Sequence, residues 1–430
     1  MTFDDLTEHG GCLFVVLHTL ACGLRALALA EDLGGVGADN LTCCLVVEEL
    51  AVGDTDVAAV MAETALLGRV LFAAMSPAQR EKFLQPFLSD DRYHLAHANH
   101  EPDSDESLGV HYFRKDGSRH RVTARAVKDG NDWVINGVKD HVVNAPIAKL
   151  FAVEVATDKG ISTILVPAGA AGLTVTAQAE PRWHHGSCGR IALKDVRVPA
   201  GNLLGAAGSG PLAGLDVPFS QAVNLGIGRA AYEAALDYAQ IRVQGGRPIV
   251  QHQAIGTKLA ESAIRLETCR NMVWKAAWAA DHPEAVADRS IADLPLTSIA
   301  AVFTAENIYR ATKDCAECFG AMGVMRDMPL QKYISDARIC LYSGDGAADA
   351  KLFSVYDFQN DPKNLLTAHE MLSQADGALA TKFTVQFNLF SGTLFALHTE
   401  RHKAFLDKVD DLSAMGCFCF TELGFGNNAV

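Results

Sequence analysis

The chain has 430 residues, 49% hydrophobic and 20% charged, which is typical of a folded globular protein of several domains and excludes a mainly disordered or fibrous one. Its 37 basic and 51 acidic residues give a formal net charge of −14, which argues against nucleic acid as a partner because that partner requires a basic surface. The 11 cysteines lack metal-ligand spacing, so we expect buried free thiols and no metal site.

Residues 1–92 are predicted to form a helical domain. Apolar side chains recur three and four residues apart between Leu45 and Met75, and Ser76-Pro77 is typical of a helix start. The apolar run at residues 11–30 is interrupted by His18 and Arg25 and follows an acidic start. We therefore expect a buried helix there, with no signal peptide and no membrane span, in a cytoplasmic or organelle-matrix protein, mitochondria included.

Residues 93–203 are predicted to form an antiparallel β domain that resembles a barrel. Turn signals separate short β-rich runs at hairpin-like spacing. The runs begin at Arg121, Asp132, Leu150 and Ser162, and the turn signals are Asp129-Gly130, Asn136-Gly137 and residues 169–172. The closely spaced histidines of this region, His94, His97 and His100 at its start and the adjacent His184 and His185, do not suit a metal site on a strand.

Residues 204–362 are predicted to form an antiparallel four-helix bundle. The helical patterns cover residues 221–242, 251–281, 293–320 and 328–341, and the polar stretch 356–365 is typical of a linker.

Residues 363–430 repeat part of the N-terminal domain. Three blocks are matched, with Leu50 corresponding to Leu372, Arg80 to Arg401 and Glu101 to Glu422, so the offset stays at 321 or 322 residues. The sequence therefore predicts two or three further helices, and the chain stops about one strand into a second copy of the first domain.

Six fragments in a fixed order resemble the acyl-CoA dehydrogenase and acyl-CoA oxidase superfamily over nearly all of residues 25–360. They are Glu31-Asp-Leu-Gly-Gly-Val-Gly, Val47-Glu-Glu-Leu-Ala-Val-Gly-Asp, Ile135-Asn-Gly-Val-Lys, Val196-Arg-Val-Pro-Ala-Gly-Asn-Leu-Leu-Gly, Gly245-Gly-Arg-Pro-Ile-Val-Gln-His-Gln and Ser335-Asp-Ala-Arg-Ile. The resemblance implies the same order of helical domain, β-barrel domain and four-helix bundle. It also implies FAD as cofactor, an acyl-CoA substrate and a homo-oligomer, a dimer or a tetramer.

The resemblance assigns cofactor contacts to two groups of residues. Arg242, Gln253 and the turn containing Glu317, Gly320 and Gly323 correspond to residues that contact the FAD pyrophosphate or a neighbouring subunit's FAD. His100, His141 and Val143 stand at the strand ends that face the flavin ring. Several positions depart from the family pattern. Glu317 brings a carboxylate towards the pyrophosphate, His100 replaces a hydroxyl donor, His141 replaces a tryptophan, and the Val143 side chain cannot donate a hydrogen bond.

The position of the family's usual catalytic glutamate falls on Gly344. Two carboxylates remain as alternatives for the base that removes the α-proton. Asp216 occupies the position used by relatives that act on branched or long acyl chains, although a place two residues before Pro218 also suits a helix N-cap. Asp345 follows Gly344 directly.

Two functions follow from these residues. In the first, the chain is an FAD-dependent acyl-CoA dehydrogenase or oxidase with Asp216 or Asp345 as its base. In the second, it is a degenerate member that has lost FAD and serves as a structural or regulatory subunit in a hetero-oligomer with an active homologue.

Overall fold

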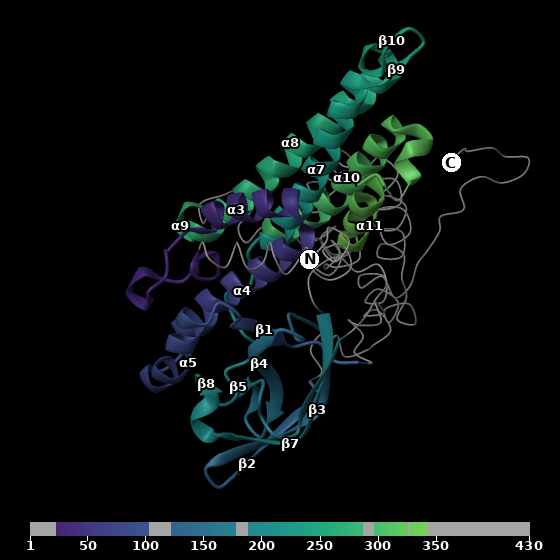
Figure 1. Cartoon of the computed structure of the whole chain (residues 1–430). Coiled ribbons are helices and arrows are strands. Elements are labelled where there is room, and N and C mark those ends of the chain that lie inside the picture. The colour runs from purple at the N-terminus through teal and green to yellow at the C-terminus, as the bar shows by residue number, and fades with distance from the viewer. Residues whose placement is uncertain (1–22, 103–121, 178–187, 287–295, 326, 342–430) are drawn as a thin grey trace, which may run out of the picture.

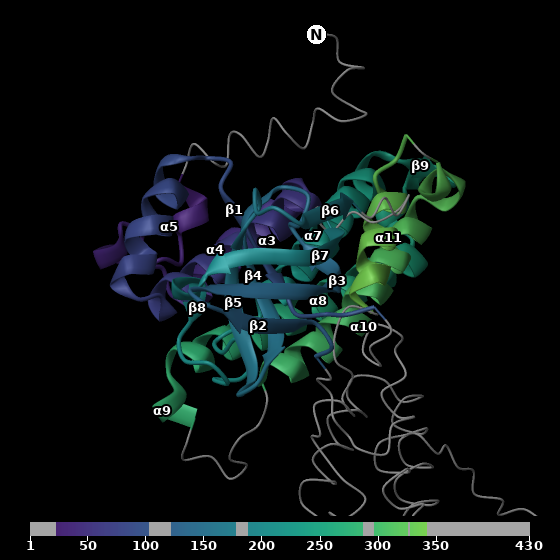
Figure 2. The ribbon, with the colours of Figure 1, turned by 90° about the horizontal axis from the view of Figure 1, so that it is seen from below.

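The structure, a computed structural model, describes residues 23–102, 122–177, 188–286, 296–325 and 327–341. Within these residues, N-terminal helices and a C-terminal helical bundle pack together on one side of a central β-sheet (Figure 1). A view turned by 90° looks onto the sheet, with α5 at one side of it and α11 at the other (Figure 2). The α+β architecture of helices, sheet and helices that the sequence predicts is confirmed.

Three helices form the N-terminal part: α3 (Asn40–Gly53), α4 (Thr55–Ala74) and α5 (Pro77–Ser89), after short 3-10 turns at Leu24–Ala26 and Glu31–Leu33. Each helix has a polar N-cap, and at α5 Ser76 and Gln79 form a reciprocal capping box, which confirms the predicted helix start. By length and composition α4 could cross a membrane, but 67% of its most apolar window is buried inside the protein.

The middle part is one mixed sheet rather than a purely antiparallel one. Its strands are β1 (His94–Ala98), β2 (Arg125–Asp129), β3 (Asp132–Val143), β4 (Ala148–Thr157), β5 (Gly160–Pro167), β6 (Leu173–Ala177), β7 (Cys188–Pro199) and β8 (Leu203–Leu204). The order is β6-β7-β3-β2-β4-β5-β8, and β1 also pairs with β4. β4 runs parallel to β1 and β2 because a long crossover brings the chain back in the same direction.

Asn136-Gly137 is not the turn that the sequence predicts. It lies inside β3, where the register to β7 shifts between Ile135 and Gly137. Gly137 has a φ of 151°, and a Cβ there would lie 2.5 Å from the Cβ of Ala124. The glycine thus serves a β-bulge and a close approach of two backbones, which local sequence cannot distinguish from a hairpin turn.

The bundle consists of α7 (Phe219–Ile241), α8 (Gln253–Asp281), α10 (Leu296–Cys318) and α11 (Leu330–Cys340), which confirms the four predicted helical segments. A hairpin of β9 (Val243–Gln244) and β10 (Arg247–Pro248) joins α7 to α8. The bundle also contains three short helical turns: α9 (Pro283–Val286), Ile249–Gln251 and Gly320–Val324. A further turn, Ala200–Asn202, precedes the bundle.

α3 packs directly on the bundle. A Cβ on Gly226 of α7 would lie 2.5 Å from both the Cβ of Ala51 and the carbonyl oxygen of Glu48 on α3. Buried side chains of α3, α4, α7, α8, α10 and α11 form one continuous core there, and a second core fills the space beneath the curved sheet. The two helical parts therefore behave as one packed layer above the sheet.

Several predictions concern residues outside the described ones. These are most of the helix expected at residues 11–30, the histidines at 184 and 185, Gly344 and Asp345, and the partial repeat at 363–430. The described end of the first of these segments is not α-helical, because Gly23 has a φ of 70° and a 3-10 turn follows it.

Candidate active site

The end of β1 meets β3 at a bulge. The backbone amide of Asp140 donates a hydrogen bond of 3.0 Å to the carbonyl oxygen of His100. The register of β3 to β7 shifts between Lys139 and Val142, and His141 has a φ of 49°, which leaves its side chain exposed while Val142 stays buried. The structure therefore brings three predicted residues, His100, His141 and Val143, close together.

Asp140 adds a charge pair beside these residues. Its carboxylate is 7% exposed and accepts a hydrogen bond of 2.6 Å from Arg190 on β7, whose side chain is 49% exposed. This hydrogen bond lowers the pKa of Asp140 below its usual range. The bulge thus carries two imidazole groups beside a guanidinium that is paired with the buried Asp140.

A buried ion pair fixes the end of β1 to β3. Nζ of Lys139, which is fully buried, lies 2.8 Å from Oε1 of Glu101 and donates a second hydrogen bond of 3.1 Å to the carbonyl oxygen of Asn99. The hydroxyl and amide of Thr123 and the amide of Ala124 also donate to Glu101. Burial alone would raise the pKa of Glu101, but these hydrogen bonds outweigh burial and lower it.

Asn144 connects the same bulge to α4. It is fully buried with a φ of 63°, and its Nδ2 donates to the carbonyl oxygens of Val60 and Leu95 and to the hydroxyl of Thr64. Thr64 in turn contacts Nδ1 of the buried His94 at 3.1 Å. The strand end is consequently held in place by the ion pair of Lys139 and by the hydrogen bonds to α4.

Glu154 of β4 links β1 to the loop between β8 and α7. Its Oε1 lies 2.9 Å from Nε2 of His97 and accepts the backbone amide of Leu212, also at 2.9 Å. The side chains of His97 and Glu154 are 8% and 5% exposed. Burial alone would raise the pKa of Glu154, but the hydrogen bond from His97 and the contacts around it lower it, so Glu154 is a carboxylate near neutral pH.

Glu63 of α4 is the next charged neighbour of this pair. Its side chain is half-buried. Burial raises the pKa of Glu63, and His97 acts in the opposite sense without overcoming that effect. Among the described residues no side chain forms a hydrogen bond or an ion pair with the Glu63 carboxyl group.

Asp216 lies in the same loop, four residues after Leu212, with its side chain exposed. It does not cap α7: the N-cap is Pro218, and no side chain hydrogen-bonds to the first turn. The capping role that the sequence suggested is therefore wrong, because the chain reaches α7 through tight turns in which Val217 and Phe219 donate to the carbonyl oxygens two residues earlier.

The predicted pyrophosphate residues gather at the far end of the bundle. Arg242 is exposed at the end of α7, Gln253 is the first residue of α8, and Gly320 and Gly323 lie in the turn after α10. Figure 1 places the β9–β10 hairpin at the end of the bundle that points away from the sheet. α7 has 23 residues. At 1.5 Å per residue α7 is about 35 Å long, and Arg242 follows its last residue, beside the hairpin.

Glu317 is neutralised where it lies. Its Oε2 is 2.6 Å from Nζ of Lys258, which also contacts Asp314 at 3.1 Å. The hydrogen bond to Glu317 raises the pKa of Lys258. The repulsion that a lone carboxylate at this position would exert on an anion is thus reduced.

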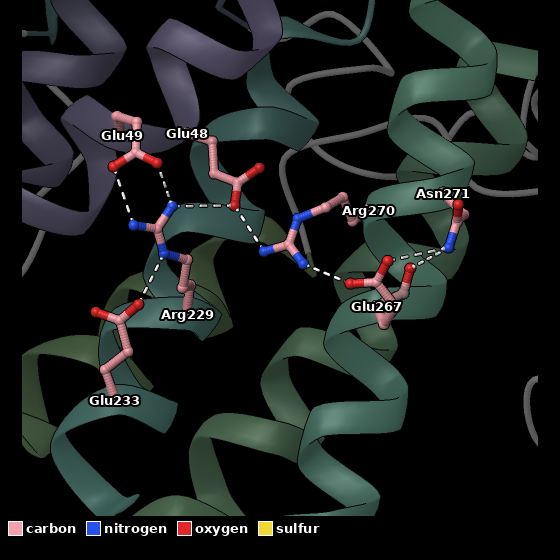
Figure 3. Close-up of polar contacts among 7 residues, drawn as sticks. All are labelled: Glu48, Glu49, Arg229, Glu233, Glu267, Arg270 and Asn271. Atoms are coloured by element: carbon pink, nitrogen blue, oxygen red, sulfur yellow. Dashed lines mark hydrogen bonds and ion pairs between the residues drawn. The ribbon is translucent and has the colours of Figure 1, made fainter. Parts of the chain in front are cut away.

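A charged groove of about 490 Å³ between α3, α7 and α8 is a separate feature (Figure 3). Arg229 contacts Glu49 at 2.5 and 2.9 Å and also reaches Glu48 and Glu233. Arg270 contacts Glu48 at 2.9 Å and Glu267 at 2.6 Å. The arginines and glutamates pair with one another, and these ion pairs connect α3 to the bundle.

Three polar residues were not identified from the sequence: Glu63, Lys139 and Glu154. A signal was present for the last two, because each is a charged residue inside an apolar strand, where a charge is retained only if it is paired. Periodicity could not give their partners, which come from strands far away in the sequence.

Three family models match the chain in order: the N-terminal domain of acyl-CoA dehydrogenase over residues 15–91, the middle domain over 115–196 and the C-terminal domain over 219–352. Among curated proteins, the probable acyl-CoA dehydrogenase YngJ of Bacillus subtilis is 31% identical over 76% of this chain and 84% of its own length. The human mitochondrial short-chain specific acyl-CoA dehydrogenase is 31% identical over 75% of this chain and 77% of its length.

Solved structures agree with these matches. Butyryl-CoA dehydrogenase from Megasphaera elsdenii superimposes with a TM-score of 0.68 at 27% identity and covers 78% of this chain and 87% of that one. A glutaryl-CoA dehydrogenase from Mycobacterium smegmatis, 21% identical, shares the fold with a TM-score of 0.69.

Proposed function

Because the chain belongs to the acyl-CoA dehydrogenase family, we propose that it is an FAD-dependent oxidoreductase that dehydrogenates an acyl thioester of coenzyme A between its α- and β-carbons. The observation that carries the proposal is the agreement of all three parts of the fold, in order, with enzymes of this activity, including a butyryl-CoA dehydrogenase that covers 78% of the chain.

The end of the bundle suits the phosphates of FAD. Arg242 is exposed and forms no ion pair within the described residues. Gly246 and Gly320 have positive φ, and no atom lies within 4 Å of the place where a Cβ would stand. Open backbone beside a guanidinium is the arrangement that binds phosphate groups, so Arg242, Gln253 and Gly320 would hold this part of the cofactor. Gly323 is buried against the carbonyl oxygen of Ala316 and would only shape the turn.

The bulge at the end of β3 suits the flavin ring. His100 and His141 offer imidazole groups in place of a hydroxyl and an indole, whereas the Val143 side chain supplies no donor. The chemistry that FAD supplies when bound is acceptance of the hydride that leaves the β-carbon.

The hairpin end of the bundle, next to Arg242, points away from the sheet whose strand ends carry His100 and His141. We infer a homo-oligomer, a dimer or a tetramer, in which the bundle end of one subunit reaches the strand ends of another. Exposed apolar side chains at the bundle end support this inference. They are Ile241, Val243, Met322, Val324 and Met325.

Asp216 is the proposed base. Its carboxylate is exposed and has no capping role, and the loop that carries it is held to β4 through Glu154 and Leu212. An oxygen of Asp216 takes the α-proton, the electron pair left on the α-carbon forms the new double bond, and the β-carbon loses a hydride. Asp345 is the second choice for this role.

Replacement of Asp216 by Asn tests this assignment because it keeps the shape and removes the proton acceptor. We expect kcat to fall roughly 10²- to 10⁴-fold. The flavin content should not change, and Asp158→Asn, on an exposed turn, should behave as the wild type.

Unchanged turnover in the Asp216→Asn variant would move the role to Asp345. If the native chain binds no flavin and turns over no acyl-CoA, the second function applies, a structural subunit that partners an active homologue.

The cytoplasm or an organelle matrix is the proposed compartment. Several similar proteins are named as mitochondrial enzymes, among them those of human and cow. Fractionation of cells that express the tagged full chain tests this proposal.

A further inference from the structure

Three elements converge beside the proposed base. Gly214, two residues before Asp216, lies against α4, where a Cβ on it would be 3.4 Å from Cγ2 of Val70. Glu63 is seven residues before Val70 and therefore shares its face of α4. Leu212 of the same loop is bound to Glu154, which holds His97 of β1. The face of α4 that carries Glu63 and the carboxylate that binds His97 thus both contact the loop that carries Asp216.

The hydrogen bonds determine what these two residues can do. Glu154 is ionised and already accepts the amide of Leu212, so His97 must place a proton on Nε2 to donate to it. The other ring nitrogen, Nδ1, is then left for a further hydrogen bond. The described residues supply no donor to Nδ1 or to the Glu63 carboxylate.

Two polar side chains that each lack a hydrogen-bond partner at one or more atoms, one of them 8% exposed, are costly beside an apolar ligand. We propose that Glu63 and His97 form a polar subsite for the acyl group, and that the preferred substrate carries a hydrogen-bond donor, an amine or a hydroxyl, on its acyl chain. This inference rests on the proposed function, since that function places the acyl group beside Asp216. An ammonium group would in addition neutralise Glu63.

The test compares three thioesters of equal length on the FAD-loaded protein: pentanoyl-CoA, and the same chain with a terminal hydroxyl or a terminal amine in place of the last methyl group. Thioether analogues of all three, which cannot be oxidised, measure binding by calorimetry independently of turnover. We expect the donor-bearing chains to bind at least roughly tenfold more tightly than the pentanoyl chain.

Substitutions at Glu63 test whether the preference for donor-bearing chains arises from this subsite. Glu63→Leu should abolish it, and Glu63→Gln, which keeps shape and an amide oxygen, should retain preference for the hydroxyl but lose that for the amine. Glu81→Gln, an exposed position on α5, is the matched control and should leave both ratios unchanged.

Equal or tighter binding of the pentanoyl analogue to the wild type would overturn the subsite, as would ratios that Glu63→Leu and Glu63→Gln leave unaltered. A preserved binding preference without turnover of any thioester would instead contradict the proposed function and leave the subsite standing.

Discussion

Buried charges in the sheet are arranged in pairs. Lys139 is fully buried with Glu101, and His97 with Glu154, at contacts of 2.8 and 2.9 Å. Such pairs add little net stability over an apolar alternative, but they fix which side chains and strands lie together. Glu63 departs from this pattern, since burial raises its pKa and no described residue bonds to its carboxyl group.

His94 predicts how stability depends on pH. Burial, with a smaller effect of the nearby Arg25, lowers the pKa of His94 to about 4. An unfolded histidine titrates near 6.5, so between these two values the unfolded chain binds a proton that the folded chain does not. Above pH ~6.5 the protonation of His94 therefore does not lower the free energy of unfolding. As the pH drops towards 4, it lowers this free energy by about 3 kcal/mol.

Urea unfolding measured across this pH range checks the prediction. His94→Gln should flatten the acid limb of the stability curve relative to the wild type. Curves of equal steepness for the two proteins would mean that His94 is not responsible for it.

Helical elements are predictable from this sequence because their signals are local. Ser76 and Gln79 cap α5 as their spacing implies, and the apolar repeat locates α7, α8, α10 and α11. Strand pairing is less predictable because its partners are distant. Gly137 has the local signature of a turn, yet its function is to let β3 pass close to Ala124, a contact that no window of sequence contains.

Because Lys139 couples the end of β1 to β3, we expect its substitution to lower the stability of the protein strongly. Replacement by Met leaves Glu101 buried without its counter-ion, which should cost about 3–5 kcal/mol of unfolding free energy. Lys149→Met on the exposed side of β4 is the control and should change stability by less than about 0.5 kcal/mol. Chemical denaturation of both variants provides the measurement, and equal stability would show that the pair does not hold the strands together.

At the scale of the whole molecule, the sequence locates both proposed ends of the cofactor site but not their separation. His100 and His141 are brought together by the β3 bulge, whereas Arg242 lies at the hairpin end of α7, a helix about 35 Å long. Motif spacing carries no information on such distances. The polar subsite at Glu63 could not be predicted, because it depends on three elements that meet only in the fold. The partial repeat at residues 363–430 stays a prediction.

Anaerobic titration of the purified full-length protein with acyl-CoA thioesters measures directly whether the chain oxidises acyl-CoA with FAD. The oxidised flavin has a characteristic visible absorbance, and its loss reports hydride transfer from the substrate. We expect this absorbance to fall in proportion to the thioester added, in the wild type but not in the Asp216→Asn variant. A protein that is purified without flavin and binds none when FAD is added, or a flavin whose spectrum no acyl-CoA alters, would contradict it.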